Sequence, residues 1–266
     1  MNTKNKTLLF LLLISSSLFS CKKYLEVSPY DTIPDETTIY DRSSAEAAVR
    51  GAYRGLASLN YGSAFQNTIL QSGGDIKSLN NAQTDLNVIN YDLRSDIAFL
   101  STYWGNFYNT INRTNHIIEK VPLVTDNKLG NDLKNQLLGE AYAIRALSYF
   151  DLARVFGNVQ IFLTPTNVVA DKLGVKQSTQ AEVFAQVLED LNKAEPLLPT
   201  TIVRNRITRS TAIALRARLY LYQKKYTEAE ADINTVLANP GYKLIKPFNL
   251  AAGTSESVLE LSYSVN

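Results

Sequence analysis

The sequence has few of the residues that usually carry metal ions, disulfides and acid–base catalysis. Among 266 residues there is one cysteine, Cys21, and one histidine, His116. A single cysteine excludes an internal disulfide framework and any site that needs several thiolates. His116 lies in Asn-His-Ile-Ile-Glu-Lys, which lacks the second histidine of a zinc-protease helix. We interpret His116 as a core or surface residue of a helix, and we predict no metal site and no cofactor.

Motifs of the common enzyme classes are also missing. The chain contains no Gly-x-Ser-x-Gly, no phosphate-binding loop and no Gly-x-Gly-x-x-Gly between a strand and a helix. Acidic residues are numerous, so a pair of glycosidase carboxylates stays open, because the distance between them decides that mechanism. We predict a protein without catalytic residues.

The charge of the chain is close to balanced. There are 27 basic and 25 acidic side chains, and the excess lies in Lys4 and Lys6 near the start. Without these two lysines the numbers are equal. A neutral chain lacks the basic surface of a nucleic-acid-binding protein, so we predict no nucleic-acid partner.

Residues 1–20 have the order of a signal peptide. Two lysines precede an apolar run, Leu8–Ile14, which is too short to span a bilayer. Leu18-Phe19-Ser20-Cys21 then has the order of a lipobox, in which the cysteine is diacylated and becomes the mature N-terminus. The alternative is an ordinary signal peptide with a chance cysteine. We favour lipidation of Cys21, followed by an extended tether over residues 21–35.

The strongest helical signal is residues 138–157, which read LGEAYAIRALSYFDLARVFG. Ala141 and Ile144 belong to one apolar face, and Tyr142 and Tyr149 belong to the next. A helix that is apolar over so much of its girth must be covered on more than one side by other helices. Gly157 supplies the end, because glycine accepts the left-handed conformation that closes many helices.

A local pattern in this helix returns later in the chain. Residues 144–149 are echoed by residues 215–220, and Asp190-Leu191-Asn192 by Asp232-Ile233-Asn234. Each copy predicts a helical hairpin, with a long loop inserted in the first one. Small and aromatic residues of the second copy have spacings close to those of a tetratricopeptide repeat. We predict a mainly all-α fold over residues 36–250, an α-solenoid-type scaffold of tetratricopeptide-like hairpins with loop excursions.

Capping signals predict where two of the helices begin. Ser43 and Glu46 have the three-residue spacing of a capping box, and so do Thr179 and Glu182. The remaining elements are predicted from periodicity. Helices are expected over residues 103–122 and 210–223, and short strands over residues 159–163 and 257–263.

Residues 251–266 are predicted to begin a less regular C-terminal part. The strand expected at 257–263 has no partner before Asn266, and a lone strand exposes unpaired edge groups. We therefore expect the chain to be the first part of a longer one.

Three features have both a functional and a structural interpretation. The polar stretch Gly62–Asp96 is either a functional loop or a surface excursion without a role. Trp104 and its aromatic neighbours could stack on a sugar, but their spacing is that of a buried stripe, so we favour helix packing. For the cluster of Arg204, Arg206 and Arg209 we favour a solvated position beside a helix over phosphate binding.

Motifs along nearly the whole mature chain occur together in one known family. They are Cys21-Lys22-Lys23-Tyr24-Leu25-Glu26 with Pro29, Gly51-Ala52-Tyr53, Tyr103-Trp104 with Tyr108, Ile111, Asn115 and Ile118, Gly139-Glu140-Ala141, Arg145-Ala146, Phe156-Gly157, Arg209–Leu221, Tyr226–Ala229 and Glu256–Leu261. In this combination the chain resembles the SusD/RagB family of outer-membrane nutrient-binding lipoproteins of Bacteroidetes. Members of that family are longer, so the chain corresponds to their N-terminal portion.

The resemblance implies a lipid anchor in the outer membrane, exposure at the cell surface and a SusC-like TonB-dependent transporter as partner. Family members bind oligosaccharides, or in some cases peptides, without hydrolysing them. We therefore expect a receptor that binds a glycan or oligosaccharide and delivers it to the transporter. The second hypothesis is a tetratricopeptide-like interaction scaffold without a small ligand of its own. A peptide receptor or a glycosidase comes third.

Ligand contacts are expected in the polar stretch, because the helices bury most of their aromatic side chains. Asp75, Asn80 and Asn81 offer carboxylate and amide groups to sugar hydroxyls, near glycines that let a ligand approach. Tyr61 and Tyr91 flank the stretch as stacking surfaces. We predict these five residues as ligand-binding candidates.

Overall fold

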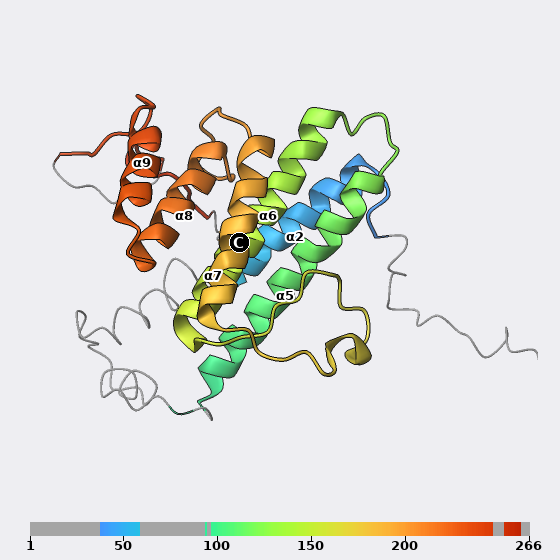
Figure 1. Ribbon diagram of the computed structural model, residues 1–266. Coiled ribbons are helices and arrows are strands. Elements are labelled where there is room, and N and C mark those ends of the chain that lie inside the picture. The colour runs from blue at the N-terminus through green and yellow to red at the C-terminus, as the bar shows by residue number, and fades with distance from the viewer. Residues whose placement is uncertain (1–37, 59–93, 95–96, 247–252, 262–266) are drawn as a thin grey trace, which may run out of the picture. The chain divides into compact units, whose positions relative to one another are not determined.

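The computed structural model describes residues 38–58, 94, 97–246 and 253–261. The chain divides after Thr38, and the described residues from Ile39 onward belong to one unit (Figure 1). Its α-helices are α2 (Arg42–Ser58), α5 (Ala98–Lys120), α6 (Asn131–Phe156), α7 (Gln180–Ala194), α8 (Arg209–Tyr222) and α9 (Tyr226–Leu237), with short 3₁₀ helices η3 (Val121–Leu123), η4 (Val169–Lys172) and η5 (Glu195–Leu197). None of these described helices is long and apolar enough to cross a membrane.

Helix α6 is the core of this unit. Every residue from Ala143 to Ala153 is buried, including the charged Arg145 and Asp151. The helix contacts α2, α5, α7 and α8, which confirms that it is covered on several sides. Gly157 follows it with a φ of 75°, a value that a residue with a Cβ atom adopts only at a cost.

Two helical hairpins confirm the predicted repeat. Helix α6 packs on α7, and α8 packs on α9 (Figure 1). The first pair is separated by residues 157–179, whereas only residues 223–225 separate the second pair. Ala217 of α8 and Ala229 of α9 are both buried, and such small side chains let helices approach closely. Helix α7 also contacts α8, so the hairpins stack in chain order as in an α-solenoid.

Helix α2 approaches α5 closely at Gly55. A Cβ atom at this position would collide with the Thr110 hydroxyl of α5. Gly51, one turn earlier in the same helix, has open space where its Cβ atom would be. Only the later of these two glycines is therefore required for the packing of α2 on α5.

Helix α2 begins one residue before the predicted start. Asp41 Oδ1 accepts a hydrogen bond from Ser44 N at 2.8 Å, and Ser44 Oγ accepts one from Asp41 N at 3.0 Å. Hydrogen bonds that the Asp41 carboxylate accepts from the Ser44 hydroxyl and from Ser44 N lower the pKa of Asp41. The predicted capping box of Ser43 and Glu46 is wrong, because Asp41 takes the capping role and Glu46 pairs with Arg42 at 3.1 Å.

The capping box at the start of α7 is confirmed. Thr179 N donates to Glu182 Oε2 at 2.7 Å, and Glu182 N donates to Thr179 Oγ1 at 3.3 Å. Helix α7 then buries the side chains that the sequence pattern placed on its inner face: Val183, Phe184, Val187, Leu191 and Ala194.

The two short strands that the sequence predicts do not form within the described residues. Residues 257–261 form no strand, so that prediction is wrong over the part described. Instead, Glu260 N donates to Arg204 O at 2.7 Å, which attaches this segment to the turn before α8. Over residues 159–163 there is one isolated bridge, between Val159 and Ser178. In both segments the backbone pairs with a turn or loop and not with a neighbouring strand.

Candidate ligand-binding site

The loop between α6 and α7 is fixed at its base and along its length. Val159 N donates to Ser178 O at 3.1 Å, and Ser178 N donates back to Val159 O at 2.9 Å. This bridge closes a loop of residues 160–177. Its first half, residues 160–166, lies against α5 without regular secondary structure of its own.

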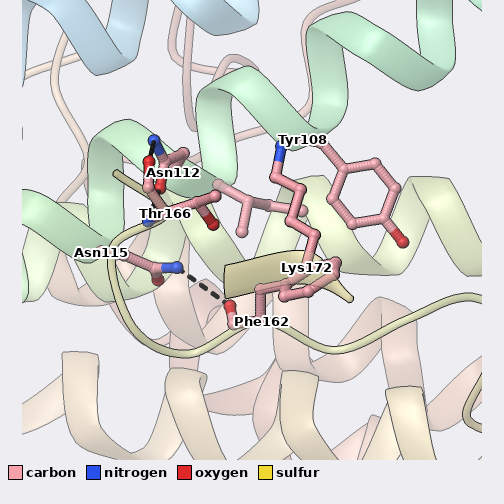
Figure 2. Close-up of a pocket in the computed structure, with 7 residues that line it drawn as sticks. Tyr108, Asn112, Asn115, Phe162, Thr166 and Lys172 are labelled. Carbon is pink, nitrogen blue, oxygen red and sulfur yellow. Dashed lines mark hydrogen bonds between the residues drawn. The ribbon is translucent and has the colours of Figure 1, made fainter. Parts of the chain in front are cut away.

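One face of α5 holds the backbone of this segment through side chains. Tyr108, Asn112 and Asn115 are spaced four and three residues apart, so they project from the same side of the helix. Asn115 Nδ2 donates to the carbonyl oxygen of Phe162 at 3.0 Å (Figure 2). It also donates to the carbonyl oxygen of Thr164 at 2.9 Å. The α5 side chains therefore bind backbone groups of the loop.

Asn112 pairs with the backbone of Thr166 in both directions. Its Oδ1 accepts from Thr166 N at 2.7 Å, and its Nδ2 donates to Thr166 O at 3.2 Å (Figure 2). Tyr108 adds a bond from its hydroxyl to Gln160 O at 2.9 Å. Burial raises the pKa of Tyr108 above its ordinary value, so its hydroxyl remains a donor.

Helix α6 holds the same segment through Tyr149. The Tyr149 hydroxyl accepts from Phe162 N at 2.7 Å and donates to Phe162 O at 2.9 Å. It thus satisfies both backbone groups of one residue, as a neighbouring strand would. Burial raises the pKa of Tyr149 too, which keeps the donor proton in place.

A buried ion pair between α6 and α7 supports the polar face of α5. Arg145 Nε lies 2.8 Å from Asp190 Oδ2, and Arg145 Nη2 lies 2.7 Å from Asp190 Oδ1. The side chains of Arg145 and Asp190 are 3% and 0% exposed. Arg145 Nη1 also donates to Asn115 Oδ1 at 2.8 Å, which leaves the Asn115 amide nitrogen directed at the loop. A chain of polar contacts therefore runs from α7 through α6 and α5 to the loop.

A small, partly open pocket lies where the loop meets α5. Lys172 of η4 extends across it towards α5 (Figure 2). The enclosed space is about 10 Å³, room for about one water molecule, so a ligand would lie across the opening and not inside it. The pocket is lined by Tyr108, Ile111, Asn112, Asn115, Phe162, Thr166 and Lys172.

Half-buried aromatic rings lie beside the pocket. Trp104 is 5.1 Å from Tyr108 and 5.2 Å from Phe156 between ring centroids, and Tyr108 is 5.7 Å from Phe162. These contacts between α5, the end of α6 and the loop support the packing interpretation of Trp104. Rings that are only half-buried also keep an apolar edge for a sugar.

The three arginines at the start of α8 are half-buried and bind protein groups, which corrects the prediction of a solvated cluster. Arg206 Nη2 lies 2.6 Å from Glu140 Oε2 of α6. Arg204 Nε donates to Thr254 O at 2.6 Å. Arg209 Nε donates to Glu195 O at 3.1 Å. Each guanidinium therefore connects the start of α8 or the turn before it to another part of the unit, a role that their clustering in the sequence did not reveal.

Most of the predicted site residues lie outside the described residues. This applies to Cys21 and to the ligand candidates Asp75, Asn80, Asn81, Tyr61 and Tyr91, which therefore remain predictions. His116 is half-buried on α5. Within the described part of the chain, no group of three or more His, Cys, Asp or Glu side chains could hold a metal ion.

Sequence reasoning missed the polar face of α5. The signal that could have found it is Asn115, an amide residue that lies between Ile111 and Ile118 on the apolar stripe of the helix. Asn115 is buried, and a buried amide must find hydrogen-bond partners. In this helix it finds them in the loop backbone and in Arg145.

Comparison with known proteins identifies relatives that are described as SusD-like. A SusD-like family model, described as starch-binding and associating with the outer membrane, matches residues 23–221. SusD-like protein P38 of Formosa agariphila is 28% identical over 91% of this chain and 47% of the relative. SusD-like protein P2 of the same organism is 23% identical over 90% of this chain and 49% of the relative. The chain thus spans about half the length of the curated relatives it matches.

Solved structures share the arrangement of the helices. A laminarin-binding SusD-like protein superposes with a TM-score of 0.68 and 27% identity, over 78% of this chain and 47% of that chain. A SusD superfamily protein from Bacteroides vulgatus superposes with a TM-score of 0.71 and 24% identity, over 82% of this chain and 49% of that chain. The likeness to the second protein concerns the fold alone.

Proposed function

The chain belongs to the SusD-like (SusD/RagB) family, and from this membership we propose that it is an outer-membrane lipoprotein that binds a glycan or oligosaccharide. We further propose that it delivers this ligand to a SusC-like TonB-dependent transporter. In this proposal Cys21 carries the lipid, residues 21–35 form the tether, and the protein faces the cell exterior. The helical unit is the receptor, and residues 251–266 begin the less regular C-terminal part.

The observation that carries the proposal is the family match over residues 23–221, together with a laminarin-binding relative of the same fold. Starch and laminarin are both neutral glucose polymers, so neutral glucans are the first ligands to test. Because the chain spans about half of its curated relatives, the transporter partner and the full ligand surface belong to the proposal.

The chemistry of the described site suits binding more than bond cleavage. Sugar recognition combines aromatic surfaces with amide and charged side chains held on a rigid support. The pocket of α5 and the loop brings Tyr108, Phe162 and Lys172 together on such a support. The candidates Asp75, Asn80 and Asn81 would add polar groups from the stretch that precedes α5. We propose that the ligand contacts one or both of these surfaces without being hydrolysed.

Isothermal titration tests the proposal directly. We expect the protein lacking residues 1–21 to bind laminarin or soluble starch, and reducing-sugar release to stay at the level of a blank. Replacing Asp75, Asn80 and Asn81 together by Ala should weaken binding. Replacing the exposed Asn109, Asn127 and Asp132 together is the matched control and should not weaken it.

Each result has a defined meaning. Undiminished affinity of the first triple variant would move the site away from the polar stretch, and Lys172→Ala would then test the described pocket. Absence of binding to any glycan would contradict the receptor proposal. Co-purification with a co-expressed SusC-like transporter tests the partnership that delivery requires.

One observation favours the second hypothesis, an interaction scaffold. Helix α9 leaves Tyr226, Ile233 and Leu237 exposed, and an apolar helix surface of this kind often contacts another protein. A scaffold would bind a protein partner while showing no heat of binding with any glycan, so the same titration separates the two hypotheses.

A further inference from the structure

Two arginines lie over one phenylalanine ring near the C-terminal ends of α6 and α8. The guanidinium carbons of Arg154 and Arg218 are each 5.6 Å from the centre of the Phe150 ring. Tyr222 meets the same ring edge-on at 5.1 Å, and its hydroxyl accepts from Arg154 Nη1 at 3.0 Å. We refer to Phe150, Arg154, Arg218 and Tyr222 as the arginine–aromatic cluster.

The cluster has a buried base and an accessible rim. Phe150 is 3% exposed, and the Arg154 side chain is 10% exposed. Tyr222 is 48% exposed and Arg218 is half-buried. The groups that a ligand would meet are therefore a phenol ring and a guanidinium, both supported by aromatic packing below them.

One polar atom of the cluster lacks a hydrogen-bond partner among the described residues. It is Arg154 Nε, which is buried. Buried polar groups are almost always hydrogen-bonded, by protein, water or a ligand. Arg154 contacts the accessible Tyr222, so this unpaired donor favours a polar molecule beside the cluster.

The charge at the cluster is positive. The buried carboxylate of Asp151 neutralises the charge of Arg154, because Asp151 Oδ1 lies 2.6 Å from Arg154 Nη2. The charge of Arg218 remains. The exposed Lys224 and Lys225 follow directly after α8. Cations are often found in the last turn of a helix, where they interact with the helix dipole. The last turn of α8 holds no basic residue. Arg218 lies before it, so the dipole does not explain its position.

We propose, building on the proposed function, that the arginine–aromatic cluster binds an anionic group of a glycan, either a carboxylate or a sulfate on a sugar ring. The planar guanidinium of Arg218 matches two oxygens of such a group. The exposed Tyr222 ring offers an apolar face to the sugar that carries it. An acidic polypeptide such as poly-L-glutamate would meet the same guanidinium, but its side chains carry no ring to lie on Tyr222, so the exposed aromatic face favours a glycan.

Comparative titration of charged and neutral glycans tests this inference. The protein lacking residues 1–21 is titrated with polygalacturonate, dextran sulfate, laminarin and soluble starch at about 0.15 M salt, where nonspecific attraction is screened beyond about 8 Å. We expect at least one charged glycan to bind more tightly than both neutral ones. Polygalacturonate and dextran sulfate distinguish a carboxylate from a sulfate.

Substitutions of Arg218 assign the effect to the cluster. Arg218→Ala should lower the affinity for the charged glycan about tenfold, because a hydrogen-bonded charge contact is lost. Arg218→Lys keeps the charge without the planar fork, and should lower the affinity less. Arg54→Ala removes an exposed arginine of α2 and is the matched control. Circular dichroism checks that each variant is folded.

The outcomes separate this inference from the function on which it rests. Binding of the neutral glycans alone, or equal losses in Arg218→Ala and Arg54→Ala, would overturn the inference and leave the receptor proposal standing. Absence of binding to every glycan would overturn both. Competition by poly-L-glutamate that is as strong as competition by the charged glycan would assign the cluster to an acidic polypeptide.

Discussion

Arg216 of α8 binds Asp232 of α9 through two hydrogen bonds of 2.8 Å, from Nε to Oδ2 and from Nη2 to Oδ1. Arg145 of α6 binds Asp190 of α7 with the same atoms. In each hairpin the arginine lies on the first helix and the aspartate on the second. The two pairs are therefore equivalent contacts in the two copies of the repeat, although a long loop separates the partners in the first copy.

The two pairs should differ in what their loss costs. Asp190→Ala leaves Arg145 charged and fully buried, so we expect the free energy of unfolding to fall by about 3–5 kcal/mol. Asp232→Ala should cost about 1–2 kcal/mol, because Arg216 is 15% exposed and keeps its contact with Glu195. Urea denaturation measures both values. Equal losses would contradict the view that burial sets the difference.

Two glycines of α2 should respond in opposite ways to the same substitution. Gly55→Ala forces a methyl group against Thr110, and we expect a loss of about 1–3 kcal/mol. Gly51→Ala meets no neighbouring atom and should stabilise the protein by about 0.5–1 kcal/mol, because alanine favours a helix more than glycine does. Thermal and urea denaturation of both variants check the signs. Destabilisation by Gly51→Ala would contradict the view that free space around the new methyl group decides the sign of the effect.

The Tyr149 hydroxyl should determine how firmly the loop is held. Tyr149→Phe leaves the N–H group of Phe162 without its hydrogen-bond partner, whereas the C=O group keeps Asn115, and we expect a loss of about 1–3 kcal/mol. The Phe162 amide should also exchange its hydrogen faster. Tyr142→Phe is the control, since the contacts of Tyr142 with Arg145 and Lys193 involve its ring, which phenylalanine keeps. Unchanged exchange at Phe162 in Tyr149→Phe would contradict this role.

The helical scaffold was predictable because its signals are local. The apolar girth of residues 138–157, the glycine that ends α6 and the capping box of Thr179 and Glu182 depend on neighbouring residues in the chain. The start of α2 was placed incorrectly because two polar pairs competed for the cap. Asp41 with Ser44 has the same spacing as Ser43 with Glu46, and the contact of Asp126 with the Arg42 backbone, 84 residues away, adds support for the first.

The candidate site was less predictable because long-range contacts build it. Asn112 and Thr166 are 54 residues apart, and no periodic pattern links them. The repeat pattern did identify Arg145 with Arg216 and Asp190 with Asp232 as equivalent positions of the two copies. It gave no sign that the arginine and the aspartate of one copy would be bonded. The predicted strand at 257–263 failed for a related reason, because the backbone partner of Glu260 is Arg204 in a turn, and alternation of side chains does not identify such a partner.

The α7 capping box should make stability depend on acid pH. Hydrogen bonds from the Thr179 backbone and hydroxyl lower the pKa of Glu182 below its ordinary value of 4.5. A carboxyl whose pKa is lower in the folded chain adds stability above its unfolded pKa, and loses that contribution as the pH falls through the folded pKa. We expect the stability difference between the wild type and Glu182→Gln to shrink from about pH 7 to about pH 3.

Glu119→Gln controls for the general loss of an acidic side chain, because Glu119 is exposed on α5 and caps no helix. Urea denaturation at each pH gives both differences. A Glu182→Gln difference that stays constant over this range, or that grows as the pH falls, would contradict the assigned role of the carboxylate.

Lipidation of Cys21 is testable in cells. The full chain should stay with the membrane fraction after a carbonate wash and should incorporate labelled fatty acid, whereas Cys21→Ala should do neither. Ser15→Ala, which keeps the lipobox residues, is the control and should behave as the wild type. Retention of Cys21→Ala in washed membranes would contradict the anchor.

The polar face of α5 and Tyr149 of α6 hold the loop mainly through hydrogen bonds to its backbone. Tyr108, Asn112, Asn115 and Tyr149 bind carbonyl and amide groups, which every residue except proline presents in the same way. The path of residues 160–166 is therefore largely independent of which side chains they carry. Substitutions in residues 160–166 can therefore change the side chains that the loop displays at the surface without changing the course of its backbone.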